Sequence, residues 1–529
     1  MPKALLLLAL LLSACGLTRS LADEESRLTD NPALLEQKAN YLNQKAERRK
    51  DAPNIIWIVA DDLGMADSDL YGSGMVHTPN INRLADIGVR FENAYVTASV
   101  CSPSRAAMLT GRYNQRFGFE HQLHSRYLKN KLEYLIFKYF MNSKPWYPQN
   151  QDVVPSAELV ASMGLPATEI TIAEVLKKYG YATGLFGKWH LTMQDANGPN
   201  AFGFDEFYGF MNSNSLYAGK SDDHIISTRN KKDWTDKYIW REGRNGLSAI
   251  QRNGQPITEE RYLTTAITDE AIAFIGQSKQ PFFTMLTYNA PHTPFQAPAD
   301  VYAKFSDIKD PVKRTYAAMI SVFDDEIGKL MDYLIRTDRF DNTLIFFISD
   351  NGGASYTHVA DNGGYKGGKI TNFEGGLKVP MVMTWPAKVG QGVRFEPCVS
   401  ALDMFSTVLN AVTPDAPPVA LDGIDLVTVI RSDQPAHDYL FFRKGYNHGV
   451  RSAEYKLTWN SETGDSLMYH IQTDPFEHVN MYDRAPVTER ETLIRAYTQW
   501  EQSMITARWP GMINFRYEDE NRNVYWFEN

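Results

Sequence analysis

The sequence predicts an α/β fold, in which helices sandwich a large, mostly parallel mixed sheet and a smaller C-terminal subdomain combines an antiparallel sheet with a helix. From Asn54 onward, short apolar runs alternate with amphipathic segments, the pattern of parallel strands joined by helices. Within residues 431–529 the apolar runs become short and alternating, as in Leu440–Phe442, and a final helix is expected near Thr488–Met504. The main domain is therefore expected to span residues 51–430.

Residues 1–22 are expected to form an export signal. Lys3 precedes an apolar run, Ala4–Leu12, that is too short to span a membrane. The run ends in Leu-Ser-Ala-Cys15, which resembles a bacterial lipoprotein signal with lipidation at Cys15; cleavage after Ala22 without a lipid is the alternative. The sequence thus predicts an exported protein, either periplasmic or anchored to the outer membrane of a Gram-negative bacterium.

Helix signals are clear at several places along the chain. The charged segment 23–50 is expected to be a tether or an outer helix that starts near Asn31. Thr171-Ile172-Ala173-Glu174 is a capping box, and a long amphipathic helix is expected from about Lys313 to Arg336. Residues 113–165, rich in aromatic and basic side chains, and the polar residues 211–262 fit neither strands nor helices, and segments this long usually serve function.

Composition excludes some classes of protein. With 529 residues, 43% of them hydrophobic, the chain can bury one large core and a smaller one. A net charge of -9 argues against a general nucleic-acid binder, although a locally basic pocket can still hold an anion. Besides Cys15 the chain has only Cys101 and Cys398, so no disulfide framework is expected. The sequence does not indicate an oligomeric state.

Five apolar runs end in, or lead into, polar residues that are able to do chemistry. In open α/β sheets the carboxyl ends of the strands form the ligand crevice, so we expect these residues to line one cleft. They are Asp61 and Asp62 after the run 54–60, Cys101 after 91–96, Lys188 and His190 after 182–186, His292 after 282–286, and Asp350 and Asn351 after 343–348.

A metal site is predicted from the acidic strand ends. Asp61, Asp62, Asp350 and Asn351 offer only hard oxygen ligands, which suit Ca²⁺ or Mg²⁺ better than zinc. The alternative is that the aspartates cap helices or turns. A second Asp-Asn-Gly-Gly begins at Asp361, but no apolar strand precedes it, so the metal is assigned to the first.

The run Cys101-Ser102-Pro103-Ser104-Arg105 is predicted to start a helix and to expose the sulfur atom of Cys101 there. Pro103 suits a first helical turn, and Arg105 follows Cys101 by four residues on the same face. A helix N-terminus beside a guanidinium group is a receptor for an oxyanion.

Three further candidates are weak when each is taken alone. Lys188 and His190 lie two apart in an extended segment and are expected to point the same way. His292 lies between two prolines, and Lys369 lies in a glycine-rich segment. A surface pair, a structural histidine and a solvated lysine are the respective alternatives.

Taken together, these residues resemble the type I, formylglycine-dependent sulfatases of the alkaline-phosphatase-like superfamily, from about Asn54 to the C-terminus. Cys101–Arg105 with Leu109–Arg112 matches the family's activation signature, and Gly187–His190 matches a second motif. Lys369 with Phe373-Glu374-Gly375-Gly376 matches a third, and Asp474-Pro475-Phe476-Glu477 is similar to part of the usual C-terminal subdomain.

The resemblance implies cofactors and roles. A separate maturation enzyme would oxidise Cys101 to 3-oxoalanine (formylglycine), whose gem-diol attacks sulfur with one oxygen held near Ca²⁺, with Mg²⁺ as the other option. Position 101 would then join Asp61, Asp62, Asp350 and Asn351 as a metal ligand, and Asp350 would take the proton of the attacking oxygen. Arg105, Lys188 and Lys369 would neutralise the sulfate, His292 would act as general acid, and His190 would deprotonate the second hydroxyl to release sulfate.

The expected substrate is a sulfated carbohydrate, because aromatic side chains stack on sugars and local cations meet further sulfates. The sequence as a whole is similar to those of bacterial sulfatases that act on algal galactans such as carrageenan. An exo mode of action is expected, and ulvan and glycosaminoglycans are the alternative substrates. The alternative for the aromatic residues of the insertion is that they only pack against one another and stabilise the insertion. Weaker candidates for substrate contacts are Arg112, Tyr113, His121, His124 and His224.

Two other functions remain open at this level. One is a formylglycine-dependent phosphonate or phosphodiester hydrolase. The other is not an enzyme at all but a lipid-anchored glycan-binding protein with a vestigial site.

Overall fold

The computed structural model describes residues 28–529 except 73, 125–126, 129–130, 142, 150–154, 195–196, 418 and 433–435. The expected export signal and Cys15 therefore lie outside the described residues. Among the described helices, none is both long enough and apolar enough to cross a membrane.

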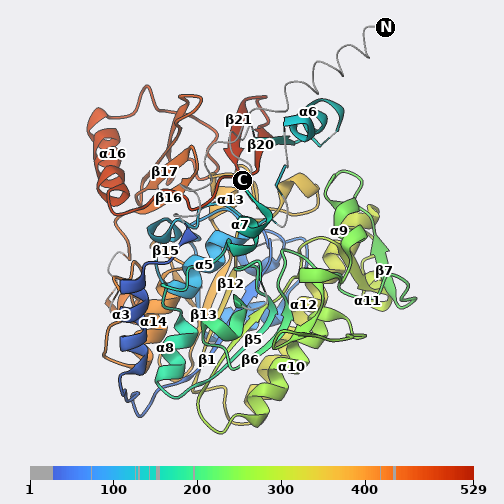
Figure 1. Ribbon diagram of the computed structural model, residues 1–529, viewed down its shortest axis with the longest axis vertical. Coiled ribbons are helices and arrows are strands. Elements are labelled where there is room, and N and C mark those ends of the chain that lie inside the picture. The colour runs from blue at the N-terminus through green and yellow to red at the C-terminus, as the bar shows by residue number, and fades with distance from the viewer. Residues whose placement is uncertain are drawn as a thin grey trace.

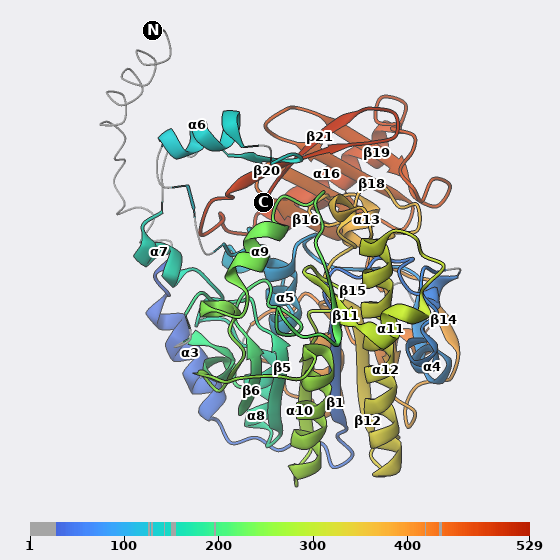
Figure 2. The same ribbon diagram turned by 90° about the vertical axis from the view of Figure 1, so that its right-hand side faces the viewer.

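A ten-stranded mixed sheet forms the centre of the molecule (Figures 1 and 2). Its five central strands are parallel, whereas β13 and β8 run antiparallel to their neighbours β12 and β6. The mostly parallel mixed sheet predicted from the sequence is thereby confirmed. In sheet order the strands are β14 (Val393–Phe395), β2 (Val89–Phe91), β13 (Met381–Thr384), β12 (Thr343–Ser349), β1 (Asn54–Ala60), β10 (Phe282–Thr287), β5 (Ala182–Lys188), β6 (Glu206–Phe210), β8 (Gln251–Arg252) and β9 (Gln255–Pro256).

Helices cover both faces of the sheet because side chains alternate along each strand. On β1, Ile55 and Trp57 pack into one core, and Ile56 and Ile58 pack into the other. The first core includes side chains of α5 (Cys101–Thr110), α8 (Ile172–Lys178) and α14 (Asp403–Val412); the second includes those of α4 (Pro79–Ile87), α10 (Leu263–Gln277) and α12 (Pro311–Arg336).

Local signals in the sequence explain where several helices start. Thr171 and Glu174 form the expected capping box at the start of α8. Asp310 caps α12, which begins at Pro311 and matches the long helix expected from about Lys313. α5 begins at Cys101 and ends at Gly111, whose left-handed conformation stops the helix.

The charged N-terminal segment packs against the main domain. Its helix α3 (Pro32–Asn43) is capped by Asn31, and the Nζ of Lys38 lies 2.7 Å from Glu174 Oε1. It is an outer helix rather than a free tether over these residues.

The C-terminal residues form the predicted smaller subdomain, at the top of both views (Figures 1 and 2). A four-stranded antiparallel sheet packs with helix α16 (Val487–Glu501). A C-terminal hairpin pairs with β4 (Trp146–Pro148) of the aromatic insertion, so the insertion and the C-terminus are joined. The sheet strands are β16 (Leu440–Lys444), β17 (Asn447–Arg451), β18 (Tyr455–Asn460) and β19 (Ser466–His470), and the hairpin is β20 (Ile513–Glu518) and β21 (Val524–Glu528).

The remaining elements border the sheet ends or lie in the two long segments. The segment 113–165 contributes α6 (Lys131–Phe140) and α7 (Ala157–Ser162), and the segment 211–262 contributes β7 (Ile225–Thr228) and α9 (Asp236–Glu242). The others are β3 (Ala94–Tyr95), β11 (Phe295–Pro298), β15 (Val399–Ser400), α11 (Ala299–Lys304), α13 (Glu374–Leu377) and α15 (Leu426–Ser432).

Candidate active site

Two neighbouring parallel strands bring the acidic residues together. β1 and β12 are paired in register up to Ala60 and Ser349, so Asp61 and Asp350 follow at the same edge of the sheet. The N–H of Asp350 donates to the carbonyl of Ala60 at 3.0 Å. The backbone of Asp62 then turns into the left-handed region, with φ of 65°, and its N–H donates to Asp350 Oδ1 at 3.2 Å. The turn directs a second carboxylate to the same place.

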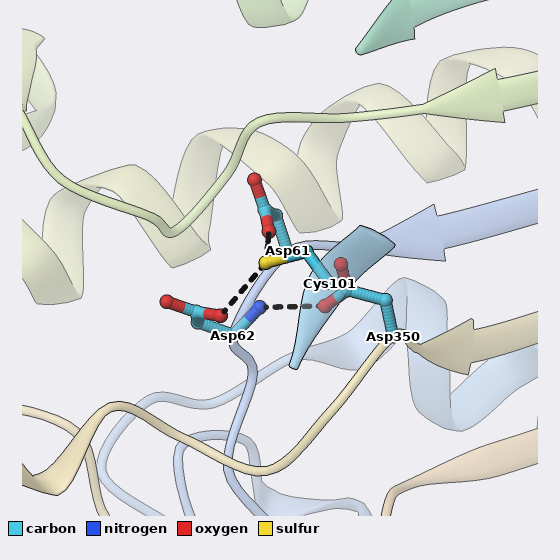
Figure 3. A group of neighbouring side chains, drawn as sticks. All are labelled: Asp61, Asp62, Cys101 and Asp350. Carbon is cyan, nitrogen blue, oxygen red and sulfur yellow. Dashed lines mark hydrogen bonds between the residues drawn. The ribbon is translucent and has the colours of Figure 1, made fainter. Parts of the chain in front are cut away.

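Cys101 completes this cluster from the first turn of α5 (Figure 3). Its Sγ lies 3.5 Å from Asp61 Oδ1 and 3.9 Å from Asp62 Oδ1. Single ligand atoms of Asp61, Asp62, Cys101 and Asp350 all lie within 4.8 Å of one another. The exposed sulfur atom predicted from the sequence is not found: Cys101 is 0% exposed, because strand ends and loops cover the start of the helix.

Three buried cations surround the carboxylates. Lys188 Nζ lies 2.7 Å from Asp61 Oδ2, and Arg105 Nε donates to Asp350 Oδ2 at 2.7 Å. Lys369 Nζ lies 2.8 Å from Asp62 Oδ1 and 3.1 Å from the sulfur of Cys101. Three acids and three bases thus compensate one another in a dry interior, where an unpaired charge would cost several kcal/mol, on the order of 3–5.

This arrangement sets the charge states. Burial tends to raise the pKa of Asp62, but Lys369 and then His292 outweigh burial and hold that pKa below its usual value. Burial raises the pKa of the Cys101 thiol, and Asp350 raises it further. Asp62 is therefore ionised while the cysteine is a neutral thiol, a poor nucleophile in this environment.

Two histidines border the cluster. Burial, followed by Lys188 and Arg105, holds the pKa of His190 well below its usual value. His190 Nε2 lies 3.3 Å from the carbonyl of Leu123, so Nε2 carries the proton and Nδ1 offers a lone pair. His292 donates from Nδ1 to the carbonyl of Thr293 at 2.6 Å, which directs Nε2 toward Asp62 Oδ2, 3.6 Å away.

The donor set fits a divalent cation that prefers oxygen. Besides the three carboxylates, Asn351 places its amide in the cluster, where Nδ2 donates to Asp62 Oδ1 at 2.8 Å. Among the residues that the structure describes, Asn351 Oδ1 is buried without a hydrogen-bond partner. A buried amide oxygen that accepts no hydrogen bond and lies beside three carboxylates is suited to coordinate a cation. The structure thus shows a buried Asp/Cys cluster that is able to bind a metal ion.

Residues 53–413 match the model of the family described as Sulfatase. The chain belongs to the sulfatase family. It is 32% identical over 402 residues to the N-acetylgalactosamine-6-sulfatase of Homo sapiens, covering 74% of this chain and 68% of that protein. It is 28% identical over 491 residues to the human steryl-sulfatase, covering 81% and 77%. The solved structure of Ps i-CgsB superposes with a TM-score of 0.70 at 31% identity, covering 87% of this chain and 94% of that one.

These matches identify the chain as a sulfuric ester hydrolase. Residues 368–502 also match the model described as N-sulphoglucosamine sulphohydrolase, C-terminal, so the likeness continues through most of the C-terminal subdomain.

Several weaker candidates of this sulfatase are engaged in other interactions. Arg112 Nη1 pairs with Glu169 Oε2 at 2.5 Å, and Tyr113 packs edge-on against Trp500 with ring centroids 5.3 Å apart. His224 is exposed, and its carbonyl accepts from Ala299 in a peripheral strand region. These three contacts stabilise the fold, so the structure does not place Arg112, Tyr113 or His224 at the cluster.

The remaining two histidine candidates lie closer to the site. His121 and His124 flank Leu123, whose carbonyl contacts His190. His121 Nε2 lies 3.7 Å from Glu528 of the C-terminal hairpin, and burial lowers the pKa of His124 to about 4. His121 is buried and His124 is half-buried, and both lie within two residues of the carbonyl that contacts the site histidine His190.

Aromatic residues lie beside the site, and of these only Trp146 belongs to the aromatic insertion that the sequence indicated. The rings of Trp146, Tyr356 and Phe515 contact one another at 5.0–5.9 Å, and Tyr356 with Trp234 packs in one cluster with Val100 and Ile370. Val100 and Ile370 directly adjoin Cys101 and Lys369. Because these rings come from four distant segments, no spacing in the sequence could have found them; only the aromatic content of the insertion gave a signal.

Proposed function

We propose that this sulfatase acts on a sulfated carbohydrate after Cys101 has been oxidised by a formylglycine-generating maturation enzyme to 3-oxoalanine. The observation that carries the proposal is the neutral, fully buried thiol of Cys101, which lies among three carboxylates that are each paired with a buried cation. Such a thiol is a poor nucleophile, whereas its surroundings suit an anion, so the residue at position 101 needs chemistry that cysteine lacks. The aldehyde, once formed, supplies a hydrated carbon with two hydroxyl groups, one to attack sulfur and one to expel sulfate.

Asp61, Asp62, Asp350 and Asn351, together with residue 101, would hold Ca²⁺, with Mg²⁺ as the alternative. When bound, the ion supplies a positive charge that lowers the pKa of an adjacent hydroxyl group. The net reaction cleaves the bond between sulfur and the ester oxygen and consumes one water, giving an alcohol, sulfate and a proton.

The three cations of the site bind the sulfate group. Arg105 is fixed by Asp350, so its guanidinium cannot rotate away as charge builds on the sulfate oxygens. Lys188 and Lys369 are held in the same way by Asp61 and Asp62. Preorganised charges cost no reorganisation during the reaction, which is why their effect in a dry site exceeds that in water.

The two histidines handle protons at opposite ends of the reaction. His292, whose Nδ1 proton is fixed on a backbone carbonyl, has to bind a second proton at Nε2 before it can protonate the leaving alcohol. Burial lowers the pKa of His292, whereas Asp61 and Asp62 favour its charged form. His190, with its low pKa and an unprotonated Nδ1, accepts the proton that leaves the residue at position 101 during sulfate release. Asp350 is the acceptor for the first proton.

We infer that the carbohydrate is an algal galactan of the carrageenan type, cleaved in an exo mode. Support comes from Ps i-CgsB, which has been solved in complex with k-i-k-neocarrahexaose and superposes on this chain with a TM-score of 0.68 at 31% identity. The similarity to N-acetylgalactosamine-6-sulfatase favours a sulfated galactose-type sugar as well, with a glycosaminoglycan or ulvan as the other options. The half-buried ring of Tyr356, which packs against the buried Trp146 beside the site, suits stacking on a sugar face.

The phosphonate alternative rests on fold alone. A phosphonate monoester hydrolase of Agrobacterium radiobacter superposes with a TM-score of 0.56 at 19% identity. The non-enzymatic alternative, a vestigial glycan-binding site, is disfavoured because the acids, the cations and His292 are in contact within the cluster. Export and lipidation at Cys15 remain part of the proposal, with the outer membrane of a Gram-negative bacterium as the location.

The decisive experiment measures sulfate release from defined oligosaccharides of carrageenan, ulvan and glycosaminoglycans. The protein must be loaded with Ca²⁺, and mass spectrometry of the Cys101 peptide must show the aldehyde. Release from one glycan class that disappears in Cys101→Ala supports the proposal. If aldehyde-bearing protein releases sulfate from no glycan but cleaves phosphonate monoesters, the proposed function is wrong.

A further inference from the structure

The helix α6 of the aromatic insertion exposes an apolar stripe. Leu132, Ile136, Tyr139 and Phe140 are exposed by 39%, 43%, 66% and 83%. Their spacing of four, three and one residues places them on one side of the helix. Among the described residues fourteen large hydrophobic side chains are exposed, and four of these lie within this one helix. We call these four residues the α6 face.

The opposite side of α6 attaches the helix to the protein. Phe137 packs edge-on against Trp234 of the polar segment, with ring centroids 5.1 Å apart. In both views α6 lies at the outer edge of the molecule, beyond the ends of the central strands (Figures 1 and 2). The α6 face therefore points away from a firmly attached inner side.

Lysines flank the α6 face. Lys131 and Lys138 are exposed and lie seven residues apart, on the side of the helix next to the stripe. Lys138 Nζ lies over the rings of Tyr134 and Tyr139 at 5.4 and 5.5 Å, which holds its charge at the border of the stripe. The same helix carries one acidic side chain, Glu133, so its own charge is still positive in a protein whose net charge is -9.

We propose that the α6 face lies in the surface of an anionic lipid bilayer. An exposed helix with leucine, isoleucine and aromatic residues on one side and lysines beside them fits the boundary between acyl chains and headgroups, since the apolar stripe enters the acyl region and the ammonium groups meet anionic headgroups. A sulfated glycan would satisfy the lysines but offers no apolar phase for Leu132 and Ile136. A second copy of the chain would also bury the stripe, and light scattering in the test below distinguishes that outcome.

This proposal goes beyond the proposed function and does not depend on it. A ten-residue helix buries little apolar area, so its binding is reversible and adds to any other anchor rather than replacing one.

The test is sedimentation of the protein with vesicles. The chain is purified after export as Cys15→Ala, so that no acyl chain at that position contributes, and mixed with vesicles of phosphatidylglycerol and phosphatidylethanolamine or of phosphatidylcholine alone. The variant Ile136→Asp/Phe140→Asp is compared with a matched control, Val487→Asp/Ile494→Asp, which changes two exposed residues of α16 in the same way. Near-ultraviolet circular dichroism and thermal melting confirm that each variant is folded.

The parent and the α16 variant should bind the anionic vesicles. The α6 variant should bind them at least about tenfold more weakly. Lys131→Glu/Lys138→Glu should reduce binding to anionic vesicles by about tenfold with little change on phosphatidylcholine. The proposal is overturned if the parent binds no vesicles, or if the α6 variant binds as well as the parent. It is also overturned if the α6 variant loses only a dimer seen by light scattering, or only binding to a soluble sulfated glycan.

Discussion

The Nζ of Lys456 lies 2.9 Å from Glu374 Oε1, and both side chains are buried. Lys456 belongs to the C-terminal sheet, whereas Glu374 starts α13, five residues after the site residue Lys369. Glu477 closes the link: its Oε1 lies 3.0 Å from the same ammonium group, and its Oε2 accepts the N–H of Glu374 at 2.7 Å. The C-terminal subdomain thus holds the segment that carries Lys369 through one buried cation shared by two carboxylates.

Removal of this cation should destabilise the protein and disturb the site. Lys456→Met removes the ammonium group between two buried carboxylates and leaves Glu374 with the more distant Arg451, 3.8 Å away, which is expected to cost about 3–5 kcal/mol of unfolding free energy. Urea unfolding measures this cost, and kcat with a small sulfate ester reports on Lys369. Lys456→Met/Glu477→Gln, which removes one negative charge as well, should recover part of the loss. A single variant as stable as the parent would show that the link is dispensable.

The same link predicts a dependence of stability on pH. Burial raises the pKa of Glu477 from 4.5 to about 7, although Lys456 opposes this. The folded state therefore binds this proton more tightly than the unfolded state, and the contribution is complete below pH 4.5 and is lost as pH rises to about 7. Glu477→Gln should remove this decline, which amounts to at most about 1.4 kcal/mol per pH unit. Urea unfolding at several pH values checks it; an unchanged slope would contradict the assignment.

Replacement of Arg105 by lysine should impair turnover although the charge is kept. Lysine cannot reproduce the bond from Nε to Asp350 together with a guanidinium plane toward the anion, so kcat/KM is expected to fall about 100-fold. Arg112→Lys is the matched control, because Arg112 pairs with Glu169 and not with the cluster. Equal effects of the two substitutions on kcat/KM would contradict the role of Arg105.

His292 should matter most for poor leaving groups. A sugar alkoxide needs a proton as it departs, whereas 4-nitrophenolate leaves without one. His292→Gln is therefore expected to lower kcat on a sulfated oligosaccharide by about 100-fold or more, with a much smaller loss on 4-nitrophenyl sulfate. The exposed His224 supplies the control, His224→Gln. An equal loss on both substrates would rule out a role as general acid.

Calcium should stabilise the folded protein through the first of the two Asp-Asn-Gly-Gly motifs. Chelation with EGTA is expected to lower Tm, and added Ca²⁺ to restore it in a concentration-dependent manner. Asp350→Asn should abolish the calcium-dependent shift in Tm. Asp361→Asn should keep it, since the N–H of Asp361 donates to Asp67 and the residue lies outside the cluster. If Asp361→Asn, and not Asp350→Asn, abolished the calcium-dependent shift in Tm, the metal site would have to be assigned to the second motif.

Much of the fold and part of the site could be predicted from patterns along the chain. The alternation of apolar runs and helices predicted the sheet, since period-two and helical spacings report directly on which faces are buried. The capping box at Thr171 and the start of α12 were readable because they depend on neighbours in sequence. Polar residues at strand ends indicated one cleft because parallel strands share a carboxyl edge.

Other features could not be predicted from the sequence because they depend on contacts between distant segments. The burial of Cys101 depends on loops that close over α5, so a helix start that looks exposed in sequence is fully covered. Arg112 ends the segment that matches the activation signature, and Tyr113 follows it directly. Arg112 nevertheless pairs with Glu169, and Tyr113 packs against Trp500, away from the cluster. The role of Glu374 and Glu477 in holding the Lys369 segment was invisible, because Lys456 lies in a third segment.

The sequence by itself determined the fold class, the family motifs and the types of ligand atom available at the strand ends, because these depend on residue type and local spacing. Only the tertiary structure decided which charges meet, since the pairing of Lys188 with Asp61, Lys369 with Asp62 and Arg105 with Asp350 joins residues 127 to 307 positions apart. It also decided that the apolar side of α6 stays exposed, because no spacing within a helix says whether another segment will cover it.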